Sequence, residues 1–224
     1  MIKKNFNNSF AVIFDMDGVI VDSNPTHTIA LRKFCELHEY HLTDDELKTR
    51  VYGRPNKDWI PDIFGNRLTP EQYRKLASAK EALFRELFAP IIKPLAGLIA
   101  FLEKLEANHI PKAIASSAPP ENIEFTLEKT GVKRFFDIML AESDVNNGKP
   151  DPEIYLMAAN ALHIPPKQCI VFEDSLAGIE AGKRAGCKVI GVTTTHVCSE
   201  LVGTDLVIDD FQGLKLQTLM SLFH

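Results

Sequence analysis

The sequence contains no long apolar run and no excess of basic charge. No stretch reaches the roughly 18 consecutive apolar residues that a membrane-spanning helix needs, so no membrane association is expected. The 25 Lys and Arg residues are outnumbered by 30 Asp and Glu residues, which gives a formal net charge of −5. A chain of this charge is unlike the basic proteins that bind nucleic acid, so DNA and RNA are not expected partners.

Cysteine is also scarce, and its spacing excludes the usual cysteine chemistry. The sequence has four cysteines, with neither a CxxC spacing nor a nearby pair of histidines. We therefore expect Cys35, Cys169, Cys187 and Cys198 to be small buried apolar residues rather than zinc ligands or redox groups. The apolar run that follows polar residues 1–9 is too short for the h-region of a signal peptide. These absences predict a cytoplasmic protein, with a monomer as the default state.

The sequence does contain six short apolar runs, separated by amphipathic helical patterns. Near-continuous apolar runs are typical of strands that are buried on both faces. Their alternation with helices predicts an α/β fold with a doubly wound parallel sheet. The predicted strands are residues 10–14, 112–115, 138–141, 169–172, 188–193 and 205–208.

One long segment interrupts this alternation. Residues 22–94 contain helical signals and no convincing strand, and Thr43 with Glu46 and Thr69 with Gln72 are typical of capping boxes at helix starts. We therefore predict an α/β core domain of residues 1–21 and 95–224. Residues 22–94 are predicted to form an inserted α-helical cap domain.

Polar side chains follow three of the predicted strands. Ligands of open parallel sheets bind outside the carboxyl ends of the strands, so we expect these groups to meet in one crevice. The polarity of loops explains one such group easily, but three on one edge poorly. Clustered carboxylates repel one another unless a cation lies among them, and ligands that are all oxygen favour Mg²⁺. The residues are Asp15 and Asp17, Ser116 and Ser117, and Glu173 and Asp174.

Lys149 supplies charge of the opposite sign. It lies in a loop that Pro150 and Pro152 stiffen. A solvated surface lysine is one interpretation; the other, which we favour, is a fixed ammonium that faces a phosphate and a charged nucleophile. The sequence has no Walker phosphate loop and no GxGxxG, GxSxG or HExxH motif that would indicate a different site.

These residues resemble the four motifs of the haloacid dehalogenase-like superfamily, in type and in order. The motifs are Asp15-Met16-Asp17-Gly18-Val19, Ser116, Lys149 and Glu173-Asp174. The resemblance covers nearly the whole chain and is greatest to the branch of β-phosphoglucomutase and sugar phosphatases, which carries a helical cap. It implies a Rossmann-like core and an aspartyl-phosphate mechanism.

The resemblance implies a catalytic role for each motif residue. Asp15 is the nucleophile that attacks phosphorus, and Asp17 is the general acid and base. Ser116 and the backbone that follows it at Ser117 bind the phosphoryl oxygens. Lys149 offsets the negative charge of phosphate and nucleophile. The acid at Asp17 disfavours dehalogenation, because the dehalogenases of the superfamily have no acid there.

The resemblance also implies the ligands of a Mg²⁺ ion. They are the Asp15 carboxylate, the Asp17 backbone carbonyl and Asp174. Glu173 lies close by, as a ligand itself or through a water molecule.

Two residues of the predicted cap match positions that β-phosphoglucomutases use near the sugar and the acid–base aspartate. They are His27 and Lys80. Lys80 falls on the apolar face of a predicted helix, where a charged residue either extends to solvent or faces a site. We therefore include both among the candidate substrate-binding residues.

Two departures from the mutases concern the phosphate that is not transferred. Asn56 stands where the mutases have an arginine, and whether Arg54 replaces that arginine is left open. Pro119 and Pro120 stand where the mutases have a lysine and an asparagine. A mutase must retain a bisphosphate intermediate, so these losses favour a phosphatase.

We therefore predict a Mg²⁺-dependent phosphatase of a small phosphorylated metabolite, such as a sugar or polyol phosphate. The alternative is β-phosphoglucomutase or a related hexose-phosphate mutase. A non-catalytic sensor of phosphorylated metabolites with the same fold is the third hypothesis.

Overall fold

The computed structural model describes residues 10–51, 56–65 and 67–223. The chain divides into two compact units: an α/β unit that extends up to Asp22 and resumes at Lys93, and a helical unit of Ser23–Ile92. No helix in the described ranges is long and apolar enough to cross a membrane.

The α/β unit contains a six-stranded parallel sheet, which confirms the predicted strands and fold class. The strand order is β3-β2-β1-β4-β5-β6. The chain therefore moves outward in one direction from β1 to β3 and in the other direction from β4 to β6. This reversal places the topological switch point, where ligands bind in such sheets, between β1 and β4. The strands are β1 (Ala11–Phe14), β2 (Lys112–Ala115), β3 (Ile138–Leu140), β4 (Cys169–Glu173), β5 (Lys188–Val192) and β6 (Leu206–Ile208).

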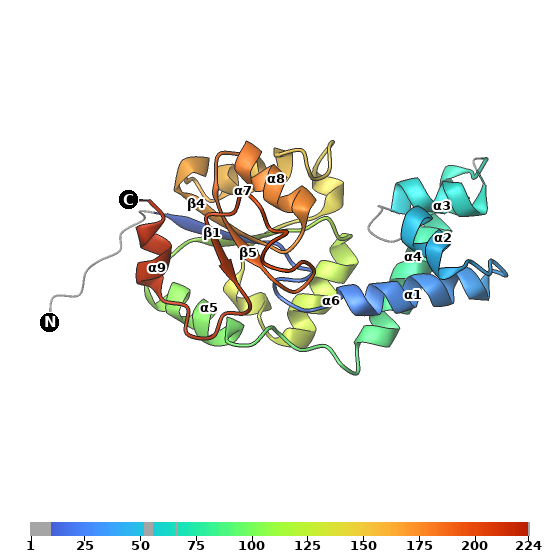
Figure 1. Ribbon diagram of the computed structural model, residues 1–224, viewed down its shortest axis with the longest axis horizontal. Coiled ribbons are helices and arrows are strands. Elements are labelled where there is room, and N and C mark those ends of the chain that lie inside the picture. Colours follow the sequence, from blue (N-terminus) through green and yellow to red (C-terminus); the bar gives the residue numbers. More distant parts are fainter. Residues whose placement is uncertain (1–9, 52–55, 66, 224) are drawn as a thin grey trace, which may run out of the picture. The chain divides into compact units, whose positions relative to one another are not determined.

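Helices cover both faces of the sheet (Figure 1). Two of them, α7 and α8, pack on one face, and α5 and α9 lie on the other side. The α-helices of this unit are α5 (Leu98–Ala107), α6 (Pro120–Thr130), α7 (Glu153–Ala161), α8 (Leu176–Arg184) and α9 (Leu216–Ser221), with 3₁₀ turns η1 (Lys133–Phe135), η2 (Glu142–Asp144) and η3 (Pro166–Gln168).

The two central strands are buried on both faces, as their continuous apolar sequences predict. Ile13 and Val171 join the apolar core on the side of α7 and α8. On the opposite side, the rings of Phe14 and Phe172 stack with their centroids 5.2 Å apart, and Phe101 of α5 packs edge-on against both. This packing holds the carboxyl ends of β1 and β4 in fixed positions.

The described part of the helical unit contains helices and no strand. Its core includes Phe34, Trp59 and Ile60. Both predicted capping boxes form, with Thr43 and Thr69 as the N-cap residues. The helices are α1 (Asn24–Leu37), α2 (Asp44–Arg50), α3 (Asn56–Phe64) and α4 (Pro70–Phe88).

Some details differ from the sequence predictions. Cys198 is exposed, in a turn beyond β5, so the prediction that all four cysteines are buried is wrong for this one. Glu173 is the last residue of β4 rather than the first residue after it.

Candidate active site

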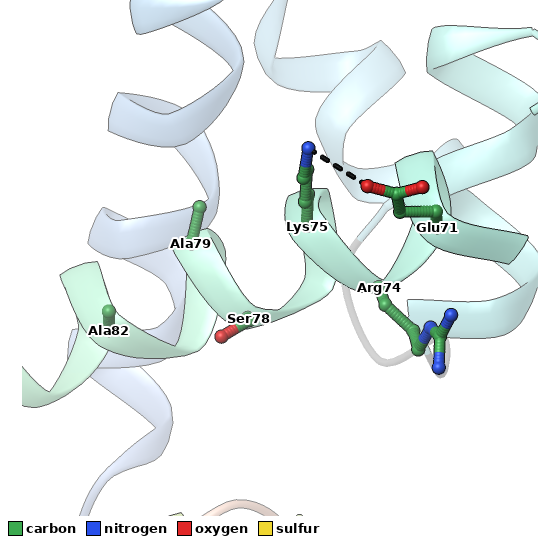
Figure 2. Close-up of a pocket in the computed structure, with 6 residues that line it drawn as sticks. All are labelled: Glu71, Arg74, Lys75, Ser78, Ala79 and Ala82. Carbon is green, nitrogen blue, oxygen red and sulfur yellow. Dashed lines mark ion pairs between the residues drawn. The ribbon is translucent and has the colours of Figure 1, made fainter.

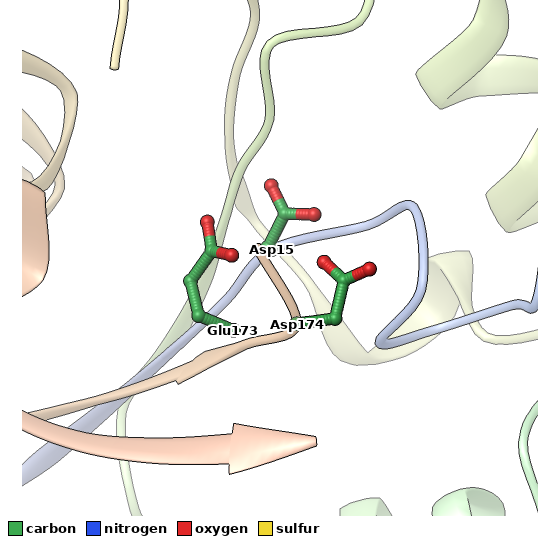
Figure 3. A group of neighbouring side chains, drawn as sticks. All are labelled: Asp15, Glu173 and Asp174. Atoms are coloured by element: carbon green, nitrogen blue, oxygen red, sulfur yellow. The ribbon is translucent and has the colours of Figure 1, made fainter. Parts of the chain in front are cut away.

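Three buried carboxylates meet at the switch point (Figure 3). The register pairs Phe14 of β1 with Phe172 of β4, and the Asp15 amide donates a hydrogen bond to the Phe172 carbonyl at 3.0 Å. Asp15 therefore leaves β1 beside the end of β4, which carries Glu173 and Asp174. Each of the three offers a carboxylate oxygen, and these oxygens lie within 4.8 Å of one another.

Lys149 lies directly among these carboxylates. Its Nζ atom donates to Asp15 Oδ1 at 2.5 Å, to Glu173 Oε1 at 2.7 Å and to the Ala115 carbonyl at 3.2 Å. Only 7% of its side chain is exposed, which excludes the alternative of a solvated surface lysine. Burial opposes the charge of this ammonium, but the Asp15 and Glu173 charges outweigh burial and raise the pKa of Lys149 above its ordinary value.

The loop that carries Lys149 is held by Glu153, the first residue of α7. The Glu153 carboxylate accepts hydrogen bonds from the backbone amides of Asn146 and Asn147, at 3.1 and 2.9 Å. These hydrogen bonds join the two ends of the loop of residues 146–153 and so restrict the backbone that carries Lys149.

One ammonium does not neutralise the carboxylates around it. Burial, followed by repulsion from Glu173, raises the pKa of Asp174 to about 7. Burial raises the pKa of Asp15 well above its ordinary value, since Lys149 only partly offsets burial and the charges of Glu173, Asp174 and Asp17 add to it. An all-oxygen donor set with excess negative charge fits a hard divalent cation, which would displace the proton that these carboxyls otherwise retain.

Asp174 approaches the backbone so closely that only glycine fits opposite it. Gly18 has a φ of 78°, and a Cβ atom there would lie 1.9 Å from Asp174 Oδ2. The Thr195 hydroxyl donates to the same Oδ2 atom, and the Thr194 hydroxyl donates to the Gly18 carbonyl at 2.6 Å. The turn after β5 thus fixes both the carboxylate and the loop beside it.

Glu173 is fully buried, and its two carboxylate oxygens each accept two hydrogen bonds. Oε1 accepts from Lys149 and from the Tyr155 hydroxyl, both at 2.7 Å. Oε2 accepts from the amide and the hydroxyl of Ser175, both at 2.9 Å. Burial would raise the pKa of Glu173, but the Lys149 charge and these hydrogen bonds outweigh burial and lower it. Glu173 is therefore a fixed anion that anchors Lys149.

The other motif residues of the α/β unit lie at the same edge of the sheet. Ser116 directly follows β2 and is buried, and its Oγ accepts a hydrogen bond from the Ala118 amide at 3.0 Å, which leaves the hydroxyl proton available to a ligand. Ser117 is exposed. Asp17 is half-buried, and its charge contributes to raising the pKa values of both Asp15 and Asp174.

The structure also brings three predicted residues of the helical unit together. Lys80 Nζ lies 3.3 Å from His27 Nδ1 and donates to Glu81 Oε1 at 2.8 Å. Asn56 Nδ2 donates to the same Glu81 oxygen at 2.8 Å. Lys80 is buried, so it does not extend to solvent from the apolar face of α4. Arg54 lies outside the described residues.

A shallow hollow on α4 holds none of the predicted site residues (Figure 2). Its lining includes Glu71 and Lys75, which form an ion pair of 3.2 Å with both side chains largely exposed. It is a solvated helix face, unlike the buried position of Lys80 on the same helix.

Sequence reasoning missed several residues that hold these groups in place. Thr194 and Thr195 follow β5, so the strand-end argument applied to the first, second and fourth strands would have found them if extended to the fifth. Tyr155 is a buried residue of α7. Its sequence pattern is that of an ordinary core residue, so the sequence does not show that its hydroxyl has a hydrogen-bond partner.

Buried carboxylates and a lysine lie at the switch point of this parallel α/β sheet. This arrangement is suited to an enzyme that transfers phosphoryl groups, and comparison of the sequence with known protein families identifies the family. The family model for haloacid dehalogenase-like hydrolases matches residues 12–192. The chain belongs to this family, in the branch that contains β-phosphoglucomutase and sugar phosphatases.

Individual relatives cover most of the chain. It is 33% identical to a phosphorylated carbohydrates phosphatase of Thermotoga maritima, over 80% of this chain and 83% of that protein. It is 30% identical to β-phosphoglucomutase of Bacillus subtilis, over 93% of each. A haloacid dehalogenase-family hydrolase of Entamoeba histolytica has a similar structure, with a TM-score of 0.87 and 31% identity over 96% of this chain and 99% of that one. The chain is therefore a phosphatase-type enzyme of this family with an inserted helical cap.

Proposed function

We propose that this enzyme is a Mg²⁺-dependent phosphatase that hydrolyses a small phosphorylated metabolite, such as a sugar or polyol phosphate, through an aspartyl-phosphate. The observation that carries the proposal is the bridge of Lys149 between Asp15 and Glu173, with Asp174 beside them. The similarity to a phosphatase of phosphorylated carbohydrates supports the substrate class.

The Mg²⁺ ion would be held by Asp15, Asp174 and the backbone carbonyl of Asp17. Glu173 already accepts four hydrogen bonds, so we propose that its contact with the ion runs through water. When bound, the ion supplies positive charge that neutralises the transferring phosphoryl group. Its ligands come from the ends of β1 and β4, which the core packing holds fixed.

Hydrolysis then takes two displacements at phosphorus. An Asp15 carboxylate oxygen attacks phosphorus, the ester P–O bond breaks, and Asp17 donates a proton to the leaving oxygen. A water molecule next attacks the aspartyl-phosphate, and Asp17 accepts its proton. The acyl-phosphate P–O bond breaks, which releases inorganic phosphate and restores the Asp15 carboxylate.

Ser116 and Lys149 stabilise the phosphoryl group in both displacements. The free hydroxyl proton of Ser116 and the amide of Ser117 donate to phosphoryl oxygens. Lys149 balances the charge that Asp15 and the phosphoryl group share. Since phosphoryl transfer depends mostly on position and electrostatics, these groups are sufficient.

A phosphomutase is the second candidate, because β-phosphoglucomutase is among the relatives. Two features favour the phosphatase. Pro119 and Pro120 form the start of α6, where no cationic side chain replaces the lysine of the mutases. The Asn56 amide donates to Glu81, so in this arrangement it is not directed to a second phosphate.

A panel of phosphate monoesters separates these functions. With Mg²⁺ and no activator, the proposal predicts phosphate release from at least one sugar or polyol phosphate. A mutase would instead convert β-glucose 1-phosphate to glucose 6-phosphate once glucose 1,6-bisphosphate is added, with little phosphate released. Binding with no turnover on the whole panel would indicate a sensor and contradict both enzymatic functions.

A further inference from the structure

Tyr155 is a fully buried residue of α7 that contacts both Lys149 and Glu173. Its hydroxyl donates to Glu173 Oε1 at 2.7 Å, and the Lys149 Nζ atom lies over its ring, 4.9 Å from the centroid. A cation over an aromatic face at this distance is attracted to the ring. Tyr155 belongs to the apolar core on the side of α7 and α8, so its position is set by packing. One core side chain therefore contacts two charged members of the site.

The hydrogen bonds of Lys149 use all three donors that an ammonium has. They run to Asp15 Oδ1, Glu173 Oε1 and the Ala115 carbonyl. Asp15 and Glu173 thus compete for one ammonium, and its position between them depends on how strongly each attracts it. Asp15 is the nucleophile of the proposed mechanism. The position of Lys149 therefore decides how much positive charge lies close to the transferring phosphoryl group.

Glu173 is limited in this competition because its acceptor positions are filled. An ionised carboxylate has about four lone-pair sites. Oε2 accepts from the amide and the hydroxyl of Ser175, and Oε1 accepts from Lys149 and Tyr155. The Tyr155 hydroxyl thus occupies the site on Oε1 that a second donor of the ammonium would otherwise take. It also stabilises negative charge on that oxygen, which weakens the attraction of Glu173 for Lys149.

We propose that Tyr155 is a positioning residue that limits the hold of Glu173 on Lys149 and so keeps the ammonium directed to Asp15 and the phosphoryl group. This inference rests on the proposed function, in which Lys149 balances the charge that Asp15 and the phosphoryl group share. It extends that function by giving a residue of the apolar core an effect on the rate. Tyr155 acts through Lys149 and Glu173 and not on the substrate itself.

The first test is Tyr155→Phe, which keeps the ring and removes the hydroxyl. Glu173 Oε1 then has a vacant acceptor site, so a crystal structure should show Lys149 Nζ nearer to Glu173 and farther from Asp15. On the most active monoester of the panel, with saturating Mg²⁺, kcat and kcat/KM should both fall about tenfold, since the lost effect acts in the transition state. KM should stay nearly unchanged for the same reason.

Thr130→Val is the matched control. The Thr130 hydroxyl is also buried, and it donates to the Thr126 carbonyl at 2.7 Å, the same length as the bond from Tyr155 to Glu173. Both variants lose one buried hydrogen bond, so both should have a lower free energy of unfolding in urea. Only Tyr155→Phe should lower kcat. A merely structural role of Tyr155 would lower stability in both variants and leave kcat of the folded enzyme unchanged in both.

Two analogues at position 155 separate the hydrogen bond from packing. Replacing Tyr155 by p-aminophenylalanine keeps a donor on a ring of similar size, whereas p-methylphenylalanine fills the same space without a donor. The amino analogue should retain most of the wild-type kcat, and the methyl analogue should lose about as much as Tyr155→Phe. This pair decides if Tyr155→Phe fails to fold by circular dichroism.

Three results would overturn the inference. They are equal kcat values for the two analogues, a wild-type kcat in folded Tyr155→Phe, and unchanged distances from Lys149 to Asp15 and Glu173 in that variant. Wild-type enzyme that releases phosphate from no monoester of the panel would overturn the proposed function instead.

Discussion

The two units of this protein each bury a lysine beside carboxylates, with different consequences. In the α/β unit, Lys149 contacts two carboxylates and lies in a cluster with a third, so one positive charge faces at least three acidic groups. In the helical unit, Lys80 contacts one carboxylate of the described residues, that of Glu81. Among the described groups, the first cluster carries excess negative charge, whereas the second pairs one ammonium with one carboxylate.

This difference in charge balance assigns different chemistry to the two clusters. Burial, together with the negative charge of the neighbouring carboxylates, raises the pKa values of Asp15 and Asp174, and this excess of acidic groups fits a divalent cation. In the described residues, Lys80 and Glu81 form an ion pair with one charge of each sign, and no cluster of carboxylates surrounds it. The same residue types thus form a candidate metal and phosphoryl site in one unit and a buried ion pair in the other.

The largest expected effect comes from the nucleophile. Asp15→Asn keeps the shape of the side chain but removes the carboxylate that attacks phosphorus, so kcat should fall by about 10³-fold or more. The measurement is phosphate release under single-turnover conditions, with folding checked by circular dichroism. Turnover that persists at wild-type rates would show that the nucleophile is assigned wrongly.

The next effect concerns the charge balance itself. Lys149→Met leaves three buried carboxylates without their cation, so at pH 8 and without Mg²⁺ the free energy of unfolding should fall by about 3–5 kcal/mol. Mg²⁺ should restore part of this loss, because it supplies the missing positive charge to the cluster. The measurement is urea unfolding with EDTA or with Mg²⁺.

Lys80→Met is the matched control for this rescue. It also removes a buried ammonium, but only one carboxylate remains, so Mg²⁺ should not restore its stability. Equal rescue of the two variants would contradict the contrast between the clusters.

A smaller effect is expected from packing at Glu173. A Cβ atom at Gly178 of α8 would lie 1.7 Å from Glu173 Oε1, so Gly178→Ala should displace the anchor of Lys149. The expected cost is about 1–3 kcal/mol of unfolding free energy, together with a lower kcat, despite the higher helix propensity of alanine. Gly148→Ala is the control, since nothing lies within 4 Å of a Cβ atom there; it should leave the unfolding free energy nearly unchanged.

The smallest effect is the dependence of Mg²⁺ affinity on pH. The pKa of Asp174 lies at about 7 because of burial and Glu173, so below pH 7 the cation must displace a proton. The affinity should therefore fall by at least about tenfold for each pH unit below 7, because the raised pKa of Asp15 adds to the effect of Asp174. Isothermal titration calorimetry at pH 6, 7 and 8 measures this, and an affinity that rises as the pH falls would contradict the assignment.

The sheet is predictable from the sequence because its central strands are buried on both faces. Such strands are continuous apolar runs, and the parallel order then directs the residues that follow them to one edge. The amino-acid sequence alone therefore identifies Asp15, Ser116 and Asp174 as neighbours. These side chains are predictable because backbone topology alone brings them together.

Other features depend on side-chain packing, which the sequence pattern does not contain. Lys80 and Glu81 are adjacent on α4, and adjacent helical residues do not normally face each other, so the sequence does not predict their ion pair. The pair forms because His27 and Asn56 hold both side chains in one buried position. Tyr155 likewise has the sequence pattern of a core residue, and only its contact with Glu173 distinguishes it.

In the proposed mechanism, Asp15 becomes covalently phosphorylated during turnover. Rapid acid quench of the enzyme with Mg²⁺ and a ³²P-labelled sugar monophosphate, followed by peptide mapping, tests it directly. We expect hydroxylamine-labile label on the peptide that contains Asp15 and no label in the Asp15→Asn variant. Acid-stable label on another residue, or product release with no labelled enzyme at any time point, would contradict it.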